Sequence, residues 1–124
     1  MLRFVVLTHD HPFPHWDFLL EDGAACRTWR LLEEPGTGRT VPAEPIAEHR
    51  LHYLNYEGPV SGGRGHVARW DSGTFAWRNA GPDRIEIELS GQHLNGRCII
   101  AASNGDPLRM ACTFADVECV PGKG

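Results

Sequence analysis

The sequence predicts an all-β protein: a small closed antiparallel β-barrel of about eight short strands with little helix. Short runs rich in β-branched and aromatic residues recur at regular spacing along the 124 residues. Gly, Asn and Asp turn signals separate these runs, and no long segment has the apolar period of a helix. Closure into a barrel is favoured over an open sheet because a small open sheet would leave its edges exposed.

The first half of the chain is expected to contain four strands, at Leu2–Thr8, His15–Glu21, Ala25–Leu32 and Leu51–Tyr56. Between the third and the fourth of these, Glu33–Thr40 holds a proline and glycines and is expected to form a loop. The next segment, Pro42–His49, is expected to contain a helical turn that Pro45 limits.

The second half begins with a glycine-rich segment, Gly58–Gly65, which is expected to be a mobile loop. Five strands are expected after it, at His66–Trp70, Thr74–Arg78, Arg84–Leu89, Arg97–Ala102 and Leu108–Phe114. In the third of these strands, isoleucine and leucine alternate with glutamate, which predicts one buried and one wet face. We expect one domain over residues 1–120 and a flexible tail at 121–124.

Composition and charge limit the possible partners. The formal net charge of −4 argues against broad attraction to nucleic acid or to an anionic membrane, so any nucleic-acid contact must use a local patch. No segment approaches the ~20 apolar residues of a membrane span, so no membrane partner is expected. The apolar N-terminal run is too short for the core of a signal peptide, and a cytoplasmic location is expected.

The four cysteines do not form a Cys-x-x-Cys pair or a disulfide framework. We expect them to be small buried side chains in a reducing cytosol; they are Cys26, Cys98, Cys112 and Cys119.

The segment His9–Glu21 holds three histidines and three carboxylates, and it points to a metal site. On a strand, His15 and Asp17 face the same side with Cα atoms roughly 7 Å apart, close enough to reach one ion. His9 can fold back across the prolines between them as a third ligand. Two imidazoles and one carboxylate are typical of an open zinc, manganese or iron site. The alternative is a fortuitous solvated cluster.

The same segment carries a family resemblance. The chain resembles the 3′-phosphoesterase domain found at the N-terminus of bacterial ligase D proteins, which act in DNA end repair. Seven positions of that family's opening motif agree at fixed spacing, namely His9-Asp10, His15, Asp17-Phe18 and Leu20-Glu21. The family's later histidine, with a tyrosine four residues on, is similar to His49 and Tyr53.

The resemblance implies a function and a set of roles. His9, His15 and Asp17 would hold a divalent metal, typically manganese, with zinc left open. His49 and Tyr53 would bind and polarise a phosphate. The implied activity trims a 3′-terminal ribonucleoside and then removes the 3′-phosphate. Nucleic-acid 3′ ends are then the expected substrate, with a ligase or other repair machinery as candidate partners.

Other residues are expected to support this site. Asp10 could fix the tautomer of an imidazole, Glu21 could pair with an arginine, and Glu48 lies beside the family histidine. On a straight strand His49 and Tyr53 would stand ~13 Å apart, so they converge only if the segment bends.

Departures from the family affect its phosphate-binding half. The family has an arginine at the position of Leu19, which leucine cannot replace as a phosphate ligand. An acidic family residue falls at Ala47, and the family's glycine-rich loop is shortened at residues 60–65. Arg64 or His66 could compensate from that loop.

Three functions therefore remain open. The first is a metal-dependent phosphoesterase acting on nucleic-acid 3′ ends. The second is a weakened or inactive module that binds metal and phosphate and recognises DNA ends or a repair partner. The third is a structural β-barrel with a fortuitous histidine cluster. The sequence makes no prediction of oligomeric state.

Overall fold

The computed structural model describes residues 1–103 and 105–115 of the chain. The first strands are β1 (Leu2–His9), β2 (His15–Asp22), β3 (Ala25–Leu31) and β4 (Thr40–Arg50). A short 3₁₀ helix, η1 (Leu51–Leu54), and a two-residue strand, β5 (Gly58–Pro59), follow. The remaining strands are β6 (His66–Ala80), β7 (Arg84–Gly91), β8 (Asn95–Ser103) and β9 (Asp106–Ala115). The expected end of the domain at residue 120 and the tail at 121–124 lie outside the described residues.

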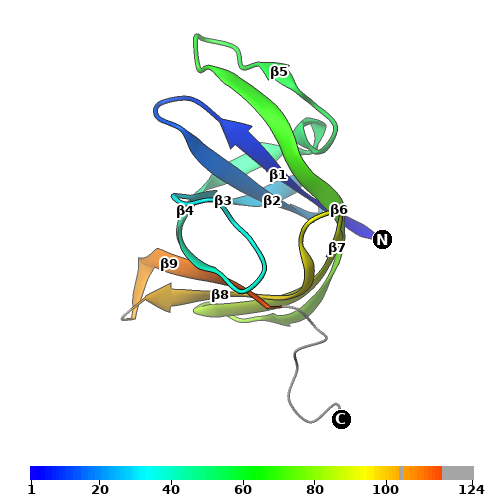
Figure 1. Ribbon diagram of the computed structural model, residues 1–124, viewed down its shortest axis with the longest axis vertical. Helices are drawn as coiled ribbons and strands as arrows, with labels where there is room; N and C mark the ends of the chain where they lie inside the picture. Colours follow the sequence, from blue (N-terminus) through cyan, green and yellow to red (C-terminus); the bar gives the residue numbers. More distant parts are fainter. Residues whose placement is uncertain (104, 116–124) are drawn as a thin grey trace.

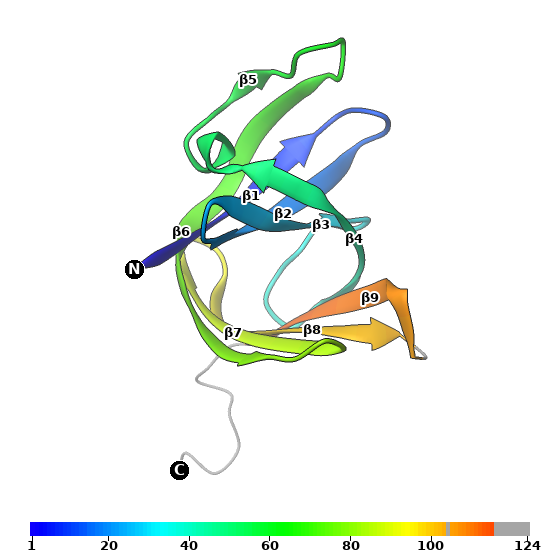
Figure 2. The same ribbon diagram turned by 180° about the vertical axis from the view of Figure 1, so that it is seen from behind.

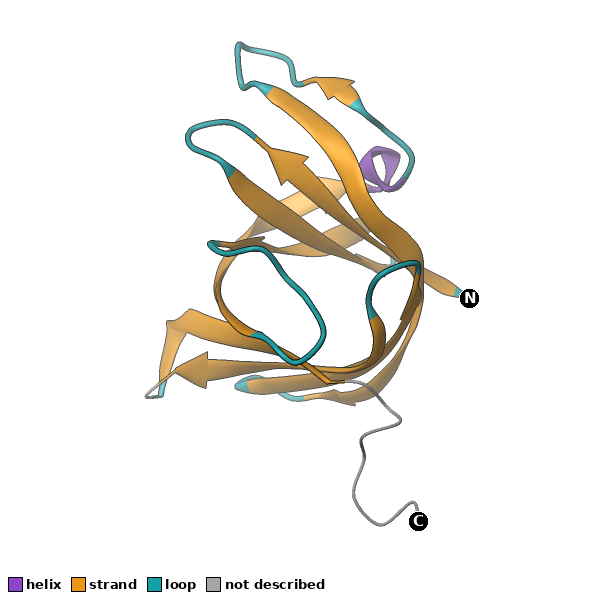
Figure 3. Ribbon diagram, in the orientation of Figure 1, coloured by secondary structure: helices purple, strands orange, loops and turns teal. Residues whose placement is uncertain are grey.

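The predicted barrel is confirmed. Eight antiparallel strands follow one another in the order β1-β2-β3-β4-β9-β8-β7-β6, and β6 pairs back onto β1 to close the barrel (Figure 1). β5 pairs with the start of β6, along the edge that β7 does not reach, and η1 is the one helical turn among the described residues (Figure 3). The long strand β6 therefore pairs with its barrel neighbours β1 and β7 and also with the short strand β5.

Alternation along β2 places its apolar side chains in two separate clusters. Phe18 and Leu20 face the barrel interior, where they pack with Trp29 and other buried residues of the main core. Leu19 faces the opposite side and belongs to a second cluster. The buried members of that outer cluster are Val5, Leu7, Leu19, Cys26, Leu54 and Val67. Figure 2 shows η1 beside β5 and β6, at the end of the molecule where this cluster lies.

The helical turn expected within Pro42–His49 is wrong, because this segment is part of β4. Beyond Ala43, β4 pairs with β3 alone, so its other edge is free of ladder hydrogen bonds. A strand with one unpaired edge tolerates proline where the missing N–H faces away from the partner strand. Pro45 therefore stays within the strand, opposite Trp29.

The strand expected at Leu51–Tyr56 is also wrong, because its first residues form η1. The turn buries Leu54 in the outer cluster. It also lets aromatic side chains meet along the chain: the His52 ring lies 5.1 Å from Tyr53 and 4.6 Å from Tyr56, between ring centroids. Aromatic residues in this segment therefore stabilise a turn rather than a strand.

The expected turn between His66–Trp70 and Thr74–Arg78 is absent, and β6 runs through it as one strand. The reason is Asp71, which is buried and faces the β7–β8 turn. Its carboxylate accepts backbone N–H bonds from Gln92 and Leu94, both at 2.8 Å, and from His93 at 3.2 Å. Gly73 allows the close approach, since a Cβ there would lie 2.8 Å from the Cα of Gly91.

The three cysteines among the described residues are buried and unbridged, as expected. Burial, reinforced by the nearby Glu21 carboxylate, raises the pKa of Cys26 to about 11. Burial and a hydrogen bond with Cys112 likewise raise the pKa of Cys98. Cys119 lies outside the described residues. Among these residues, no helix has the length and apolar character to cross a membrane.

We expect Asp71→Asn to lower the free energy of unfolding by about 3 kcal/mol, because it removes a buried charge that accepts several N–H bonds. Urea denaturation measures this loss. The control is Asp83→Asn, at an exposed turn position, which should change stability by less than ~0.5 kcal/mol. Equal stabilities for the two variants would contradict the role assigned to Asp71.

Candidate metal centre and adjoining cleft

The register of the first hairpin brings the three expected metal ligands together. His9, the last residue of β1, pairs directly with His15, the first residue of β2, and Asp17 follows two residues later. One ligand atom from each of the three side chains lies within 4.8 Å of the others. The His15 and Asp17 side chains are buried, and His9 is 15% exposed.

Backbone carbonyls fix the orientation and tautomer of both imidazoles. His15 Nδ1 lies 2.7 Å from the Phe13 carbonyl oxygen, and His9 Nε2 lies 2.9 Å from the Arg64 carbonyl oxygen. A carbonyl only accepts, so each of these ring nitrogens must donate its N–H. In the neutral rings, the lone pairs are then on His15 Nε2 and His9 Nδ1.

Both lone-pair nitrogens point at Asp17. His9 Nδ1 lies 2.8 Å from Asp17 Oδ2, and His15 Nε2 lies 2.9 Å from Asp17 Oδ1. Neutral imidazoles and a carboxylate would thus turn lone pairs toward one another, an arrangement that either protons or a shared cation must stabilise. A histidine whose other N–H is held by a carbonyl is typical of a metal ligand. The donor set therefore fits a divalent ion.

The charge state of Asp17 agrees with this fit. Burial raises the pKa of its carboxyl group. With protons in place of a metal ion between the side chains, hydrogen bonds and attraction from His15 and His9 outweigh burial, and the net pKa lies below the ordinary value. The carboxylate is therefore ionised at neutral pH and available as an anionic ligand.

A cleft of about 510 Å³ opens beside the cluster. His9, Asp17, His49 and Tyr53 all line it. The two expected phosphate-binding residues do converge: η1 turns the chain so that their ring centroids lie 5.7 Å apart. His49 Nδ1 donates to the Ala47 carbonyl oxygen at 3.1 Å, which leaves Nε2 as the ring atom available to a ligand.

The expected supporting residues have other contacts. Asp10 accepts the backbone N–H of His66 at 2.7 Å, and this bond lowers the pKa of its carboxyl group; it touches neither imidazole of the cluster. Glu21 accepts the backbone N–H of Arg3 at 2.9 Å, toward the other end of β2. Glu48 is exposed and lines the cleft.

The two residues expected to compensate for the missing phosphate ligands, Arg64 and His66, differ in their position relative to the cleft. Arg64 lines the cleft, but its guanidinium bonds to the carbonyl and hydroxyl oxygens of Ser61 at 2.8 and 3.2 Å. His66 lies outside this cleft, 3.8 Å from Asp10, with its side chain 70% exposed. Arg64 therefore reaches the cluster through its carbonyl rather than through its charge.

Leu19 is fully buried in the outer cluster, against Val5, Leu7 and Leu54. At this position the chain contributes to packing under η1 and not to the polar lining of the cleft.

The sequence reasoning missed Arg30. It lies on β3 directly opposite Asp17 and lines the same cleft. The alternation of β3 could have revealed it, because Arg30 shares a face with Cys26 and Thr28 while Trp29 and Leu31 enter the main core.

The chain is similar to known proteins of one family. The family model for the DNA ligase D 3′-phosphoesterase domain matches residues 7–101. The multifunctional non-homologous end joining protein LigD of Mycobacterium bovis is 30% identical over 112 residues, covering 83% of this chain. The Pseudomonas aeruginosa protein with the same description is 30% identical over 116 residues, covering 84%. The chain spans only 15% and 14% of the lengths of these two relatives.

Gly65 lets the glycine-rich loop close against the histidine cluster. Its φ is +78°, and a Cβ there would collide with the Asp10 carboxylate and lie 2.7 Å from the Cβ of His11. Gly63 has a similar φ of +69° but open space around it. A comparison of substitutions at the two glycines therefore distinguishes the cost of a positive φ from the cost of close contact with Asp10 and His11.

We expect Gly63→Ala to cost about 1 kcal/mol of stability through its positive φ. Gly65→Ala should cost about 2 kcal/mol more, because the loop must also move away from Asp10 and give up a hydrogen bond. Denaturant unfolding gives the two values, and amide hydrogen exchange at residues 64–66 reports loop opening. Equal effects of the two variants would contradict this account of the loop.

Proposed function

Because this chain belongs to the DNA ligase D 3′-phosphoesterase domain family, we propose that it is a divalent-metal-dependent phosphoesterase that acts on nucleic-acid 3′ ends in DNA repair. The observation that carries the proposal is the convergence of His9 Nδ1, His15 Nε2 and the Asp17 carboxylate, with both histidine tautomers set by backbone carbonyls. A cleft large enough for a nucleotide end adjoins these atoms.

The residues of the site would have different roles in the proposed reaction. His9, His15 and Asp17 would hold the ion, which supplies Lewis-acid polarisation of a phosphoryl oxygen when bound. His49 would donate a hydrogen bond or a proton through Nε2 to a phosphoryl oxygen or the leaving group. Tyr53 would add a neutral hydroxyl donor beside it. The apolar wall around Leu7 and Val67 limits water at this end of the cleft.

The finer assignments are part of the same proposal. We take manganese as the metal, with zinc as the alternative, and a 3′-terminal ribonucleoside followed by the remaining 3′-phosphate as the groups removed. DNA ends would be presented together with a ligase or other repair machinery, in the cytoplasm. The names of the relatives support this context, since both are described as non-homologous end joining proteins.

A second candidate is a module that binds metal and a DNA end without turnover. Two observations favour it: Leu19 is buried in an apolar cluster, and the exposed side chain at position 47 is an alanine. Neither position offers the charged group that the family resemblance implies there.

We expect the chain to release nucleoside and then phosphate from a primer ending in a 3′-ribonucleotide, with turnover that requires Mn²⁺ and stops in EDTA. His9→Ala and Asp17→Ala should each lower kcat/KM by more than about 100-fold, because each removes one ligand. Gel analysis and phosphate release measure the two steps.

The matched control is His93→Ala, since His93 is an exposed histidine outside the cleft, with its ring 5.3 Å from the Trp70 ring between centroids. This variant should retain wild-type turnover. Activity that survives loss of His9 or Asp17, or no activity with Mn²⁺ or Zn²⁺, would reject the phosphoesterase proposal. Metal-dependent DNA binding without turnover would support the second candidate.

The affinity for Mn²⁺ should fall on acidification, because protons compete with the ion for the lone pairs of its ligands. At mildly acidic pH Asp17 stays an anionic ligand, because its pKa lies below the ordinary value. Calorimetric titration at several pH values tests this, and a pH-independent affinity would contradict ligation by the two histidines.

A further inference from the structure

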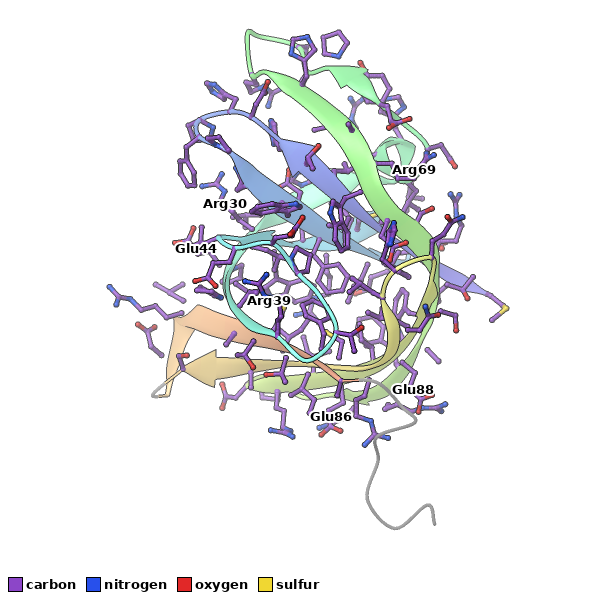
Figure 4. All side chains as sticks on the ribbon, in the orientation of Figure 1. Arg30, Arg39, Glu44, Arg69, Glu86 and Glu88 are labelled. Carbon is purple, nitrogen blue, oxygen red and sulfur yellow. The ribbon has the colours of Figure 1, made fainter. Side chains whose placement is uncertain are left out.

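Arg30 lines the cleft, and the functional roles proposed above do not use its charge. β3 pairs with β2 so that Arg30 stands directly opposite Asp17, and the two side chains therefore face the same side of the sheet. Figure 4 shows Arg30 near the β1–β2 hairpin, on the other side of the barrel from Glu86 and Glu88. The guanidinium can therefore lie beside the proposed metal ligands.

The surrounding protein does not neutralise this guanidinium. Its Nε is buried and has no hydrogen-bond partner among the residues that the structure describes. Both carboxylate oxygens of Asp17 are occupied by the histidines. Within the described part of the chain, no carboxylate lies within 4.0 Å of Arg30, although Glu44 is its register partner on β4.

One contact holds the side chain in place. The Arg30 Cζ lies 5.5 Å from the centroid of the Phe13 ring, and Phe13 in turn packs edge-on against His15 at 5.5 Å. Stacking on an aromatic face orients a guanidinium while leaving its N–H edges free. The terminal N–H groups of Arg30 are thus positioned near the histidine cluster, and no residue of 1–103 or 105–115 accepts a hydrogen bond from them.

The other arginines of the cleft are placed differently. Arg64 uses its guanidinium on Ser61 within its own loop. Arg50 is exposed and lies over the Tyr53 ring at 5.7 Å, at the end of β4 next to η1. Arg30 alone among these three faces Asp17 across a strand pair.

We propose that Arg30 binds the terminal phosphate of the substrate through the two terminal nitrogens of its guanidinium, and so selects 3′-phosphorylated ends. This rests on the proposed function. The geometry of a guanidinium matches two phosphate oxygens, and its charge complements the dianion. The cation that Leu19 cannot supply from β2 is then supplied by the neighbouring strand, from the residue opposite Asp17.

The test compares Arg30→Met with two other arginine variants on two kinds of measurement. Fluorescence anisotropy in EDTA follows binding of an oligonucleotide that ends in a 3′-phosphate against the same oligonucleotide with a 3′-hydroxyl. Steady-state kinetics with Mn²⁺ gives KM and kcat for the 3′-phosphorylated end. Calorimetry gives the affinity for Mn²⁺ alone, which reports whether the histidine cluster is intact.

Arg30→Met should abolish the preference for the 3′-phosphate and raise KM by about 10- to 100-fold, with unchanged Mn²⁺ affinity. Arg30→Lys should restore part of the preference, because it keeps the charge but not the two-pronged geometry. Arg84→Met, which removes an exposed arginine paired with Glu86, should match the wild type.

The inference is overturned if Arg30→Met keeps the wild-type preference and KM, or if Arg50→Met shows the loss instead. Failure of the proposed function looks different: the wild-type chain would then release no phosphate with Mn²⁺. In that case, binding in EDTA still tests the role of Arg30. If the wild-type chain prefers the 3′-phosphate and Arg30→Met loses that preference, the role of Arg30 is supported. A wild-type chain with no such preference rejects it.

Discussion

The register between β1 and β2 is the constraint on which the whole site depends. Pairing His9 with His15 places two imidazoles side by side at the turn end of the hairpin and sets Asp17 between their ring nitrogens. The same register continues into β3, where it puts Arg30 opposite Asp17. A shift of one residue would turn all of these side chains into the main core, so the apolar alternation that fixes the barrel also fixes the site.

Barrel closure brings the glycine-rich loop to the histidine cluster, where it contributes a carbonyl that the hairpin itself does not provide. Because β6 returns to pair with β1, the glycine-rich loop before β6 reaches the histidine cluster, and the Arg64 carbonyl accepts the N–H of His9. The Phe13 carbonyl does the same for His15 from within the hairpin. The carbonyls of Phe13 and Arg64, which are far apart in the sequence, thereby determine which ring nitrogens carry lone pairs. We regard this selection of tautomers as the feature that makes the histidine cluster fit a metal ion.

Much of this could be predicted from the sequence. The alternation in β2 and the family motif identify His9, His15 and Asp17, because local period and spacing are enough to place residues of one hairpin. The continuity of β6 could not be foreseen, since Asp-Ser-Gly has the composition of a turn and only the buried contacts of Asp71 with the β7–β8 turn override it. η1 and Arg30 were missed for a related reason: each depends on packing or pairing against a distant segment.

Backbone carbonyls hold His9 and His15 in opposite tautomers, and the lone pairs of the two rings converge where one ion could bind. Long-range ¹H–¹⁵N NMR of the imidazole rings tests it directly, with Zn²⁺ as a diamagnetic ion. The account predicts Nε2–H for His9 and Nδ1–H for His15, with Zn²⁺ shifting the resonances of His9 Nδ1 and His15 Nε2. The reverse tautomers, or ring resonances that Zn²⁺ leaves unchanged, would contradict it.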